Sequence, residues 1–128
     1  MPQAGGPFEV KLNPQQDNLD PTLGRMILDK QFRGDLEATS KGQMLTGATP
    51  VQGSGVYVAI EKVTGTLQGR RGAFLLHHTG IMHKGAPSLT ISVVPDSGTE
   101  QLAGLSGSMT IQIAEGKHSY NFEYKLEG

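Results

Sequence analysis

The strictest constraint on the fold of this chain is the alternation of apolar and polar side chains along most of its length. The clearest case is HSYNFEYKL at residues 118–126, where every second residue from His118 to Leu126 falls on one face and the residues between them are Ser, Asn, Glu and Lys. A repeat of two residues is that of a β-strand with one buried face. No stretch of ten residues keeps the repeat of an amphipathic helix. The chain is therefore predicted to be all-β.

Seven further segments show the same alternation or an apolar run bounded by glycine and proline. They are expected as strands at residues 8–12, 26–34, 35–45, 56–67, 72–83, 88–94 and 105–114. Short connections such as EGK at 115–117 favour an antiparallel meander, and the segments at 13–22 and 95–104 are expected to be loops. Eight strands in a meander can remove their free edges by closing into a barrel. We therefore predict one domain over residues 1–128, an eight-stranded antiparallel barrel.

Composition excludes several classes of site. The chain has 11 basic and 12 acidic residues spread along its length, so no electrostatic footprint for nucleic acid or an anionic membrane is expected. It has no cysteine, which excludes disulfides, thiolate–zinc sites and a cysteine nucleophile. No apolar run reaches the roughly 18 residues of a membrane helix, and MPQAGGPFEV has no signal-peptide pattern. A cytoplasmic location is expected.

Three stretches resemble a known family: EKVTGTLQGRRGAFLLHHTG at 61–80, VVPDSGTEQLAGLSG at 93–107 and KQFRGDLEA at 30–38. The chain is similar, from about Phe8 to its C-terminus, to small bacterial proteins of unknown function that are assigned the allene oxide cyclase-like (calycin-like) barrel. The resemblance implies a barrel that often associates into homo-oligomers, and no established activity. A dimer or trimer would explain an apolar outer face on VYVAI at 56–60. Plant cyclases with this barrel rearrange a fatty-acid epoxide, but none of their motif residues is seen here, so that link concerns the fold alone.

Two adjacent histidines stand near the end of AFLLHHTG at residues 73–80. Phe74, Leu76 and His78 share one face, and His77 lies on the other. Phe74 and the neighbouring glycines favour the first face as inward, and His78 also matches the H-x-G of the family pattern. We therefore expect His78 to point inward and His77 to meet water or a neighbouring subunit. His78 is then either a hydrogen-bonded core histidine or a general acid–base or ligand anchor.

Glu61 lies in YVAIEKV, where both faces carry apolar residues, so the alternation alone leaves its direction open. The family resemblance includes Glu61 and favours an inward position. A buried carboxylate must be paired or protonated, and Lys30, on the face of Leu28 and Phe32, is the candidate partner. Lys30 and Glu61 are either a structural ion pair or two solvated side chains. Alternatively, they form a cluster with His78 inside the barrel, and the three residues are then catalytic candidates. The ligand-binding residues predicted to line the lumen around them are Tyr57, Phe74, Met109, Tyr120 and Phe122.

No metal or other cofactor is expected. His77 and His78 point to opposite faces, and His83 would be about 20 Å from His77 along a strand. The glycine-rich GQMLTGATPVQGSG has no G-K-[ST], and no G-x-S-x-G elbow is present.

Three functions remain open from the sequence. The first is a barrel that binds a small apolar molecule in its lumen. The second is a cofactor-independent enzyme of the cyclase or isomerase kind, in which Glu61 or His78 moves a proton. The third is a filled barrel that acts as an oligomeric interaction protein.

Overall fold

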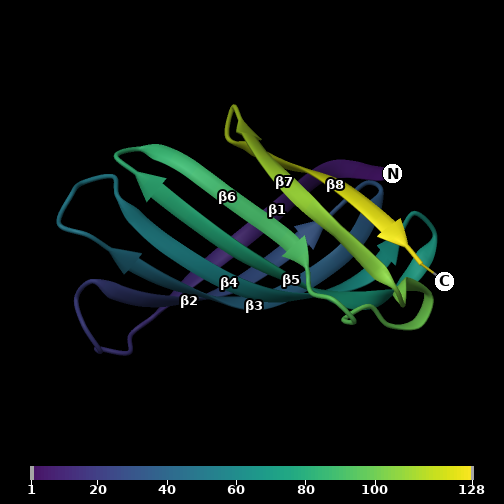
Figure 1. Cartoon of the computed structure of the whole chain (residues 1–128), viewed down its shortest axis with the longest axis horizontal. Coiled ribbons are helices and arrows are strands. Elements are labelled where there is room, and N and C mark those ends of the chain that lie inside the picture. The colour runs from purple at the N-terminus through teal and green to yellow at the C-terminus, as the bar shows by residue number, and fades with distance from the viewer. Residues whose placement is uncertain (1, 128) are drawn as a thin grey trace.

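Each strand of the protein pairs antiparallel with the strand that follows it in the chain. The computed structural model describes residues 2–127, and β1 pairs with β8 to close the eight strands into a barrel (Figure 1). This confirms the predicted fold class. The strands are β1 (Gln3–Gln15), β2 (Leu23–Phe32), β3 (Leu36–Ala48), β4 (Gly55–Leu67), β5 (Arg70–His83), β6 (Ala86–Val93), β7 (Leu105–Ala114) and β8 (Lys117–Leu126).

Two segments predicted as loops contain regular structure. β1 continues through Asn13 and Pro14 to Gln15, opposite β2. Its pairing with β8 ends at Phe8, so Pro14 lies where the strand pairs on one side only and a missing N–H is tolerated. The connection between β6 and β7 contains a 3-10 helix, η1 (Glu100–Leu102), whose Leu102 is fully buried.

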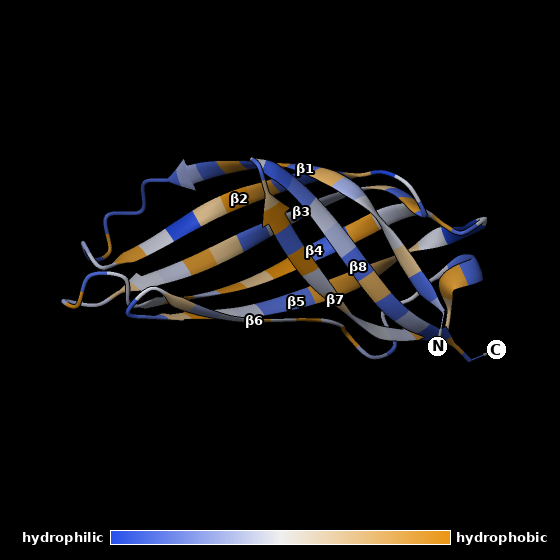
Figure 2. Ribbon diagram, turned by 90° about the horizontal axis from the view of Figure 1, so that it is seen from above, coloured by the Kyte–Doolittle hydropathy of each residue, from blue (hydrophilic) through white to orange (hydrophobic). Residues whose placement is uncertain are grey.

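The two ends of the barrel differ. Apolar and polar segments alternate along the strands (Figure 2), as a barrel with a packed interior requires. Near the β2–β3 and β4–β5 turns the interior is a dense core that includes Phe32, Leu36, Leu67, Phe74 and Phe122, each at most 1% exposed. At the opposite end, inward-facing apolar side chains remain exposed. This exposed end comprises Leu12 (45%), Met82 (43%), Leu89 (44%) and Ile113 (67%).

The cross-strand register shows that these four side chains face inward. Leu12 lies opposite the buried Leu28, and Ile113 lies opposite His118, which in turn pairs with the buried Phe8. Residues directly opposite in an antiparallel pair share a face of the sheet. The exposed surface of these side chains therefore lies on the inner side of the barrel wall.

The seam between β6 and β7 is short. Among the described residues, 2–127, two pairs span it, Ile91 with Met109 and Ser92 with Ser108. The strands separate beyond this contact toward the β7–β8 turn (Figure 1). The separated parts of both strands belong to the exposed end. Within residues 2–127, no helix has the length and apolarity needed to cross a membrane. The cytoplasmic location stays a prediction.

Candidate functional site

Four polar side chains lie buried against one another inside the barrel. They come from four consecutive strands: Lys30 on β2, Ser40 on β3, Glu61 on β4 and His78 on β5, with exposures of 7%, 2%, 0% and 4%. The inward positions expected for Lys30, Glu61 and His78 are thus observed. His77 is exposed on the outer face, as the strand alternation predicted. We call these four residues the polar cluster.

Glu61 is the centre of the polar cluster because each carboxylate oxygen has its own partner. Ser40 Oγ donates a hydrogen bond to Oε1 at 2.8 Å, and Lys30 Nζ donates one to Oε2 at 3.0 Å. The ammonium of Lys30 also lies 5.3 Å from the ring centroid of Phe8 and 5.6 Å from that of Phe32, within cation–π range. Lys30 is therefore held by a carboxylate and two aromatic rings.

The pKa of Glu61 reflects a competition between burial and these partners. Burial raises the pKa of the carboxyl group, but the contacts with His78 and Lys30 outweigh it and lower the pKa from 4.5 to about 2. Glu61 is therefore ionised at neutral pH. A carboxylate of such low basicity is a poor general base.

His78 touches a different partner with each ring nitrogen. Nε2 lies 2.5 Å from Glu61 Oε2, and Nδ1 lies 3.3 Å from the hydroxyl of Tyr57. The carboxylate oxygen lies off the line of the ring N–H, so within residues 2–127 Nε2 has a close contact with the carboxylate but no well-aligned hydrogen bond. At this distance the charge of the carboxylate still decides where the proton resides, because a bare nitrogen lone pair would be repelled by the oxygen.

Two glycines make room for the site. Gly42 lies opposite Glu61, and a Cβ there would be 2.2 Å from the carbonyl oxygen of Ile60 and 2.7 Å from Glu61 Cα. Gly80 lies opposite Tyr57, and a Cβ there would be 2.3 Å from the tyrosine ring. The first glycine lets β3 and β4 approach beside Glu61, and the second lets the Tyr57 ring lie across β5 with its hydroxyl toward His78.

The side chains predicted as ligand contacts fall into two groups. Tyr57 is half-buried and belongs to the site through His78. The others, Phe74, Met109, Tyr120 and Phe122, are at most 4% exposed and pack in the core. The Tyr120 hydroxyl accepts a hydrogen bond from the Leu36 backbone N–H at 2.9 Å, which ties β8 to the start of β3. A ligand-binding role for these residues stays a prediction, and their packing gives them a structural role.

Neither Ser40 nor the link between Tyr57 and His78 was predicted from the sequence. A signal for Ser40 was present, since it is a polar residue that shares an alternating face with Ala38 and Gly42, on either side of it. The Tyr57–His78 contact depends on the register of β4 with β5, in which Ala59 lies opposite His78 and Gly80 opposite Tyr57. Neither pairing can be read from one strand.

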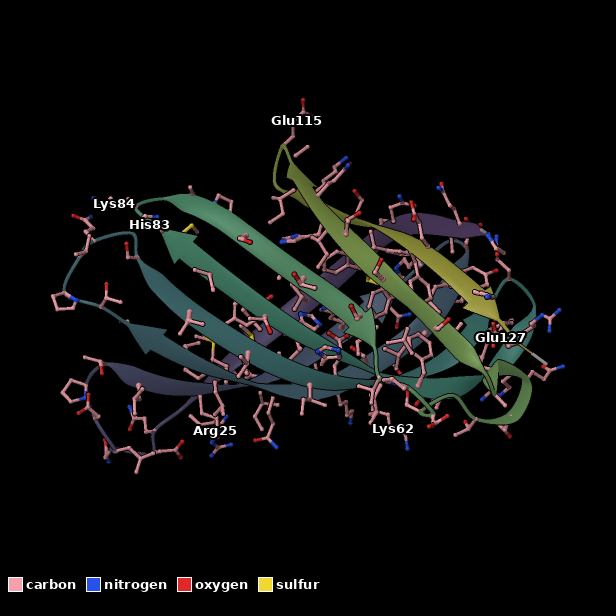
Figure 3. All side chains as sticks on the ribbon, viewed as in Figure 1. Arg25, Lys62, His83, Lys84, Glu115 and Glu127 are labelled. Carbon is pink, nitrogen blue, oxygen red and sulfur yellow. The ribbon has the colours of Figure 1, made fainter. Side chains whose placement is uncertain are left out.

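The remaining histidines do not extend the site toward a metal centre. His83 lies at the β5–β6 turn, far along the barrel (Figure 3), and is exposed. Within residues 2–127, no three His, Asp or Glu side chains gather closely enough to hold a metal ion.

Comparison with known proteins assigns the chain to a family. Residues 4–124 match the family described as "Protein of unknown function (DUF3224)". The chain belongs to this family. A DUF3224 protein of unknown function from Shewanella oneidensis MR-1, solved by crystallography, is 48% identical, with a TM-score of 0.94 over 100% of this chain and 98% of that chain. No curated protein matches the chain. The family description names no activity.

Proposed function

We propose that this DUF3224 protein binds a small, mainly apolar molecule in the barrel lumen, at the exposed end and next to the polar cluster. The observation that carries the proposal is the exposure of inward-facing apolar side chains at that end. A filled barrel buries such residues, as this one does at its other end. Exposed apolar surface costs free energy that a ligand recovers by covering it.

The polar cluster supports the same proposal. Ligand sites combine an apolar lining with a few convergent polar groups. Here Tyr57 lies opposite Gly80, and Gly80 lies opposite the exposed Leu89. The hydroxyl of Tyr57 touches His78, so the polar cluster adjoins the apolar lining. The short β6–β7 seam leaves this part of the wall without a continuous hydrogen-bonded ladder.

A matched pair of variants tests where an apolar molecule binds. Leu89 faces inward on β6 and Ile81 faces outward on β5, and both are about half exposed (44% and 51%). We expect 1-anilinonaphthalene-8-sulfonate to bind the wild type with about one site per chain in a fluorescence titration. Leu89→Asn should weaken binding about ten-fold, because it places an amide among apolar contacts, and Ile81→Asn should leave it unchanged.

Failure to bind the dye, or an equal loss in Ile81→Asn, would count against a lumen site. The natural molecule can be identified by native mass spectrometry of protein purified from its own host in gentle buffer. A bound species at about one per chain would name the chemical class.

A second candidate is a cofactor-independent cyclase or isomerase, favoured by the contact between His78 and Glu61. In this scheme His78 moves a proton while the apolar wall orients the substrate. Kinship with the allene oxide cyclase-like barrels is part of this proposal, and it rests on the eight-stranded architecture. Turnover of the molecule found by mass spectrometry, compared in wild type, His78→Ala and Glu61→Gln, distinguishes catalysis from binding.

We also propose that the protein forms a homo-oligomer through the outer face of β3–β5. Exposed apolar side chains gather there: Leu45, Val56, Val58, Ile60 and Ile81 are 43–61% exposed. Leu45, Val58 and Ile60 line a groove of about 640 Å³ on this face, together with Lys41 and Lys62. Contiguous apolar surface of this kind is typical of protein interfaces.

Sedimentation equilibrium checks the oligomer. We expect wild type to sediment as a dimer or trimer and Ile60→Lys to shift at least ten-fold toward monomer, since the new charge would be buried in the interface. Ile113→Lys, at the exposed end, is the matched control and should leave the oligomer intact. A monomeric wild type at high concentration would refute the proposal.

A further inference from the structure

The polar contacts that link Tyr57, His78 and Glu61 have a direction, with Tyr57 as the donor to His78 and Glu61 as the final acceptor. Glu61 is ionised and can only accept, and its oxygens already receive Ser40 and Lys30. The proton between Glu61 Oε2 and His78 Nε2 must therefore belong to Nε2. The positive charge of Lys30 already balances Glu61, so a neutral His78 keeps the buried cluster free of excess charge.

A neutral imidazole with its proton on Nε2 has a lone pair on Nδ1. The Tyr57 hydroxyl lies 3.3 Å from Nδ1, so Tyr57 donates its proton to His78. Burial and the negative charge of Glu61 both raise the pKa of Tyr57, so the phenol keeps that proton at neutral pH. The phenol oxygen is then left with lone pairs to offer and no proton to give.

We propose that Tyr57 is the ligand-contacting end of this chain of polar contacts, and that the preferred ligand is an apolar molecule with a hydroxyl group, whose O–H donates to the Tyr57 oxygen. This inference rests on the proposed lumen site and specifies its chemistry. The chain runs from the ligand hydroxyl through Tyr57 and His78 to Glu61. A ligand that offers only an acceptor, such as a ketone, meets an oxygen with no free proton and gains no hydrogen bond there.

Gly80 is the positioning residue in this scheme. The Tyr57 ring lies so close to the Gly80 backbone that an added Cβ would be 2.3 Å and 2.7 Å from two ring carbons. The ring would have to shift, and the hydroxyl would leave Nδ1. Gly80→Ala should therefore reduce the preference for a hydroxyl even though Tyr57 is present.

Two fluorescent probes with the same aromatic body provide the test. 2-Naphthol carries a hydroxyl group, and 2-methoxynaphthalene carries an oxygen with no proton. We expect the wild type to bind 2-naphthol roughly 3- to 10-fold more tightly, the range that one hydrogen bond supplies. In Tyr57→Phe the ratio should fall to near one while the affinity for 2-methoxynaphthalene is unchanged, because the ring remains. In Gly80→Ala the ratio should also fall.

The outcomes separate this inference from the proposed function. If both probes bind the wild type equally, or if Tyr57→Phe keeps the preference, the role of Tyr57 is refuted and the lumen site stands. If 2-acetylnaphthalene binds more tightly than 2-naphthol, Tyr57 donates to the ligand and the deduced direction is wrong. If no probe binds, the proposed lumen site fails, and the inference fails with it.

Discussion

Replacing Glu61 with leucine is expected to destabilise the fold by about 3–5 kcal/mol, the usual result of removing one partner from a buried ion pair. Glu61 is fully buried and accepts from Lys30 and Ser40. Without it, the ammonium of the buried Lys30 loses its carboxylate partner and keeps the contacts with the rings of Phe8 and Phe32. The free energy of unfolding can be measured by urea denaturation with far-ultraviolet circular dichroism, since the chain has no tryptophan to report on folding.

The double variant Lys30→Met/Glu61→Leu distinguishes a lost ion pair from a general intolerance of leucine. It removes both charges and keeps the volume, so it should recover most of the stability that Glu61→Leu loses. Lys62 is the matched control, because it is next to Glu61 on β4 but projects outside the barrel (Figure 3). Lys62→Leu should change stability by less than about 0.5 kcal/mol. A loss below about 1 kcal/mol in Glu61→Leu would show that Lys30 finds water or another partner.

The fold could be predicted because, in a strand with one buried face, the alternation of apolar and polar residues identifies both the strand and its inward side. HSYNFEYKL places Tyr120, Phe122 and Tyr124 inward, and all three are buried. The prediction of closure followed from eight strands with short connections, and the β1–β8 pairing completes it. Where the alternation weakens, as at residues 13–15, the strand persists because pairing with β2 provides backbone hydrogen bonds that side chains do not report.

The direction of Glu61 was harder to predict. Its strand carries Val56, Val58 and Ile60 on the opposite face, and these are 43–61% exposed. The apolar content of the two faces is therefore similar, and alternation alone could not decide between them. The deciding features are cross-strand: Gly42 opposite Glu61, and the contacts of Glu61 with Lys30 on β2 and His78 on β5. Such features depend on register, which is a property of strand pairs.

The difference between the two ends of the barrel could not be predicted either. Leu89 and Phe74 both belong to inward-facing apolar positions, yet Leu89 is 44% exposed and Phe74 is 1% exposed. What separates them is position along the barrel. Phe74 stacks on Phe122 in the core near the β4–β5 turn, whereas Leu89 lies beyond the last β6–β7 pair, where the wall is no longer continuous. The difference in exposure depends on where the hydrogen-bonded pairing between β6 and β7 ends. The sequence of neither strand indicates that point.

Acid should remove the stabilisation that the polar cluster provides. The pKa of Glu61 in the folded protein is about 2, below the ordinary value of 4.5. A lowered pKa means that the unfolded state binds the proton first, so the stabilisation is present above pH 4.5 and is lost as the pH falls toward 2. The shift corresponds to about 3 kcal/mol.

The comparison that isolates this effect uses the Lys30→Met/Glu61→Leu variant as the reference. Urea denaturation of both proteins from about pH 5.5 to about pH 2 should show the wild type losing on the order of 3 kcal/mol more than the variant, mostly below pH 4.5. Exposed carboxylates are common to both proteins, so their contributions cancel. Lys62→Leu, which keeps Glu61, should follow the wild type. Parallel curves for the wild type and the double variant would mean that Glu61 titrates normally, and that Lys30 and His78 do not hold its charge.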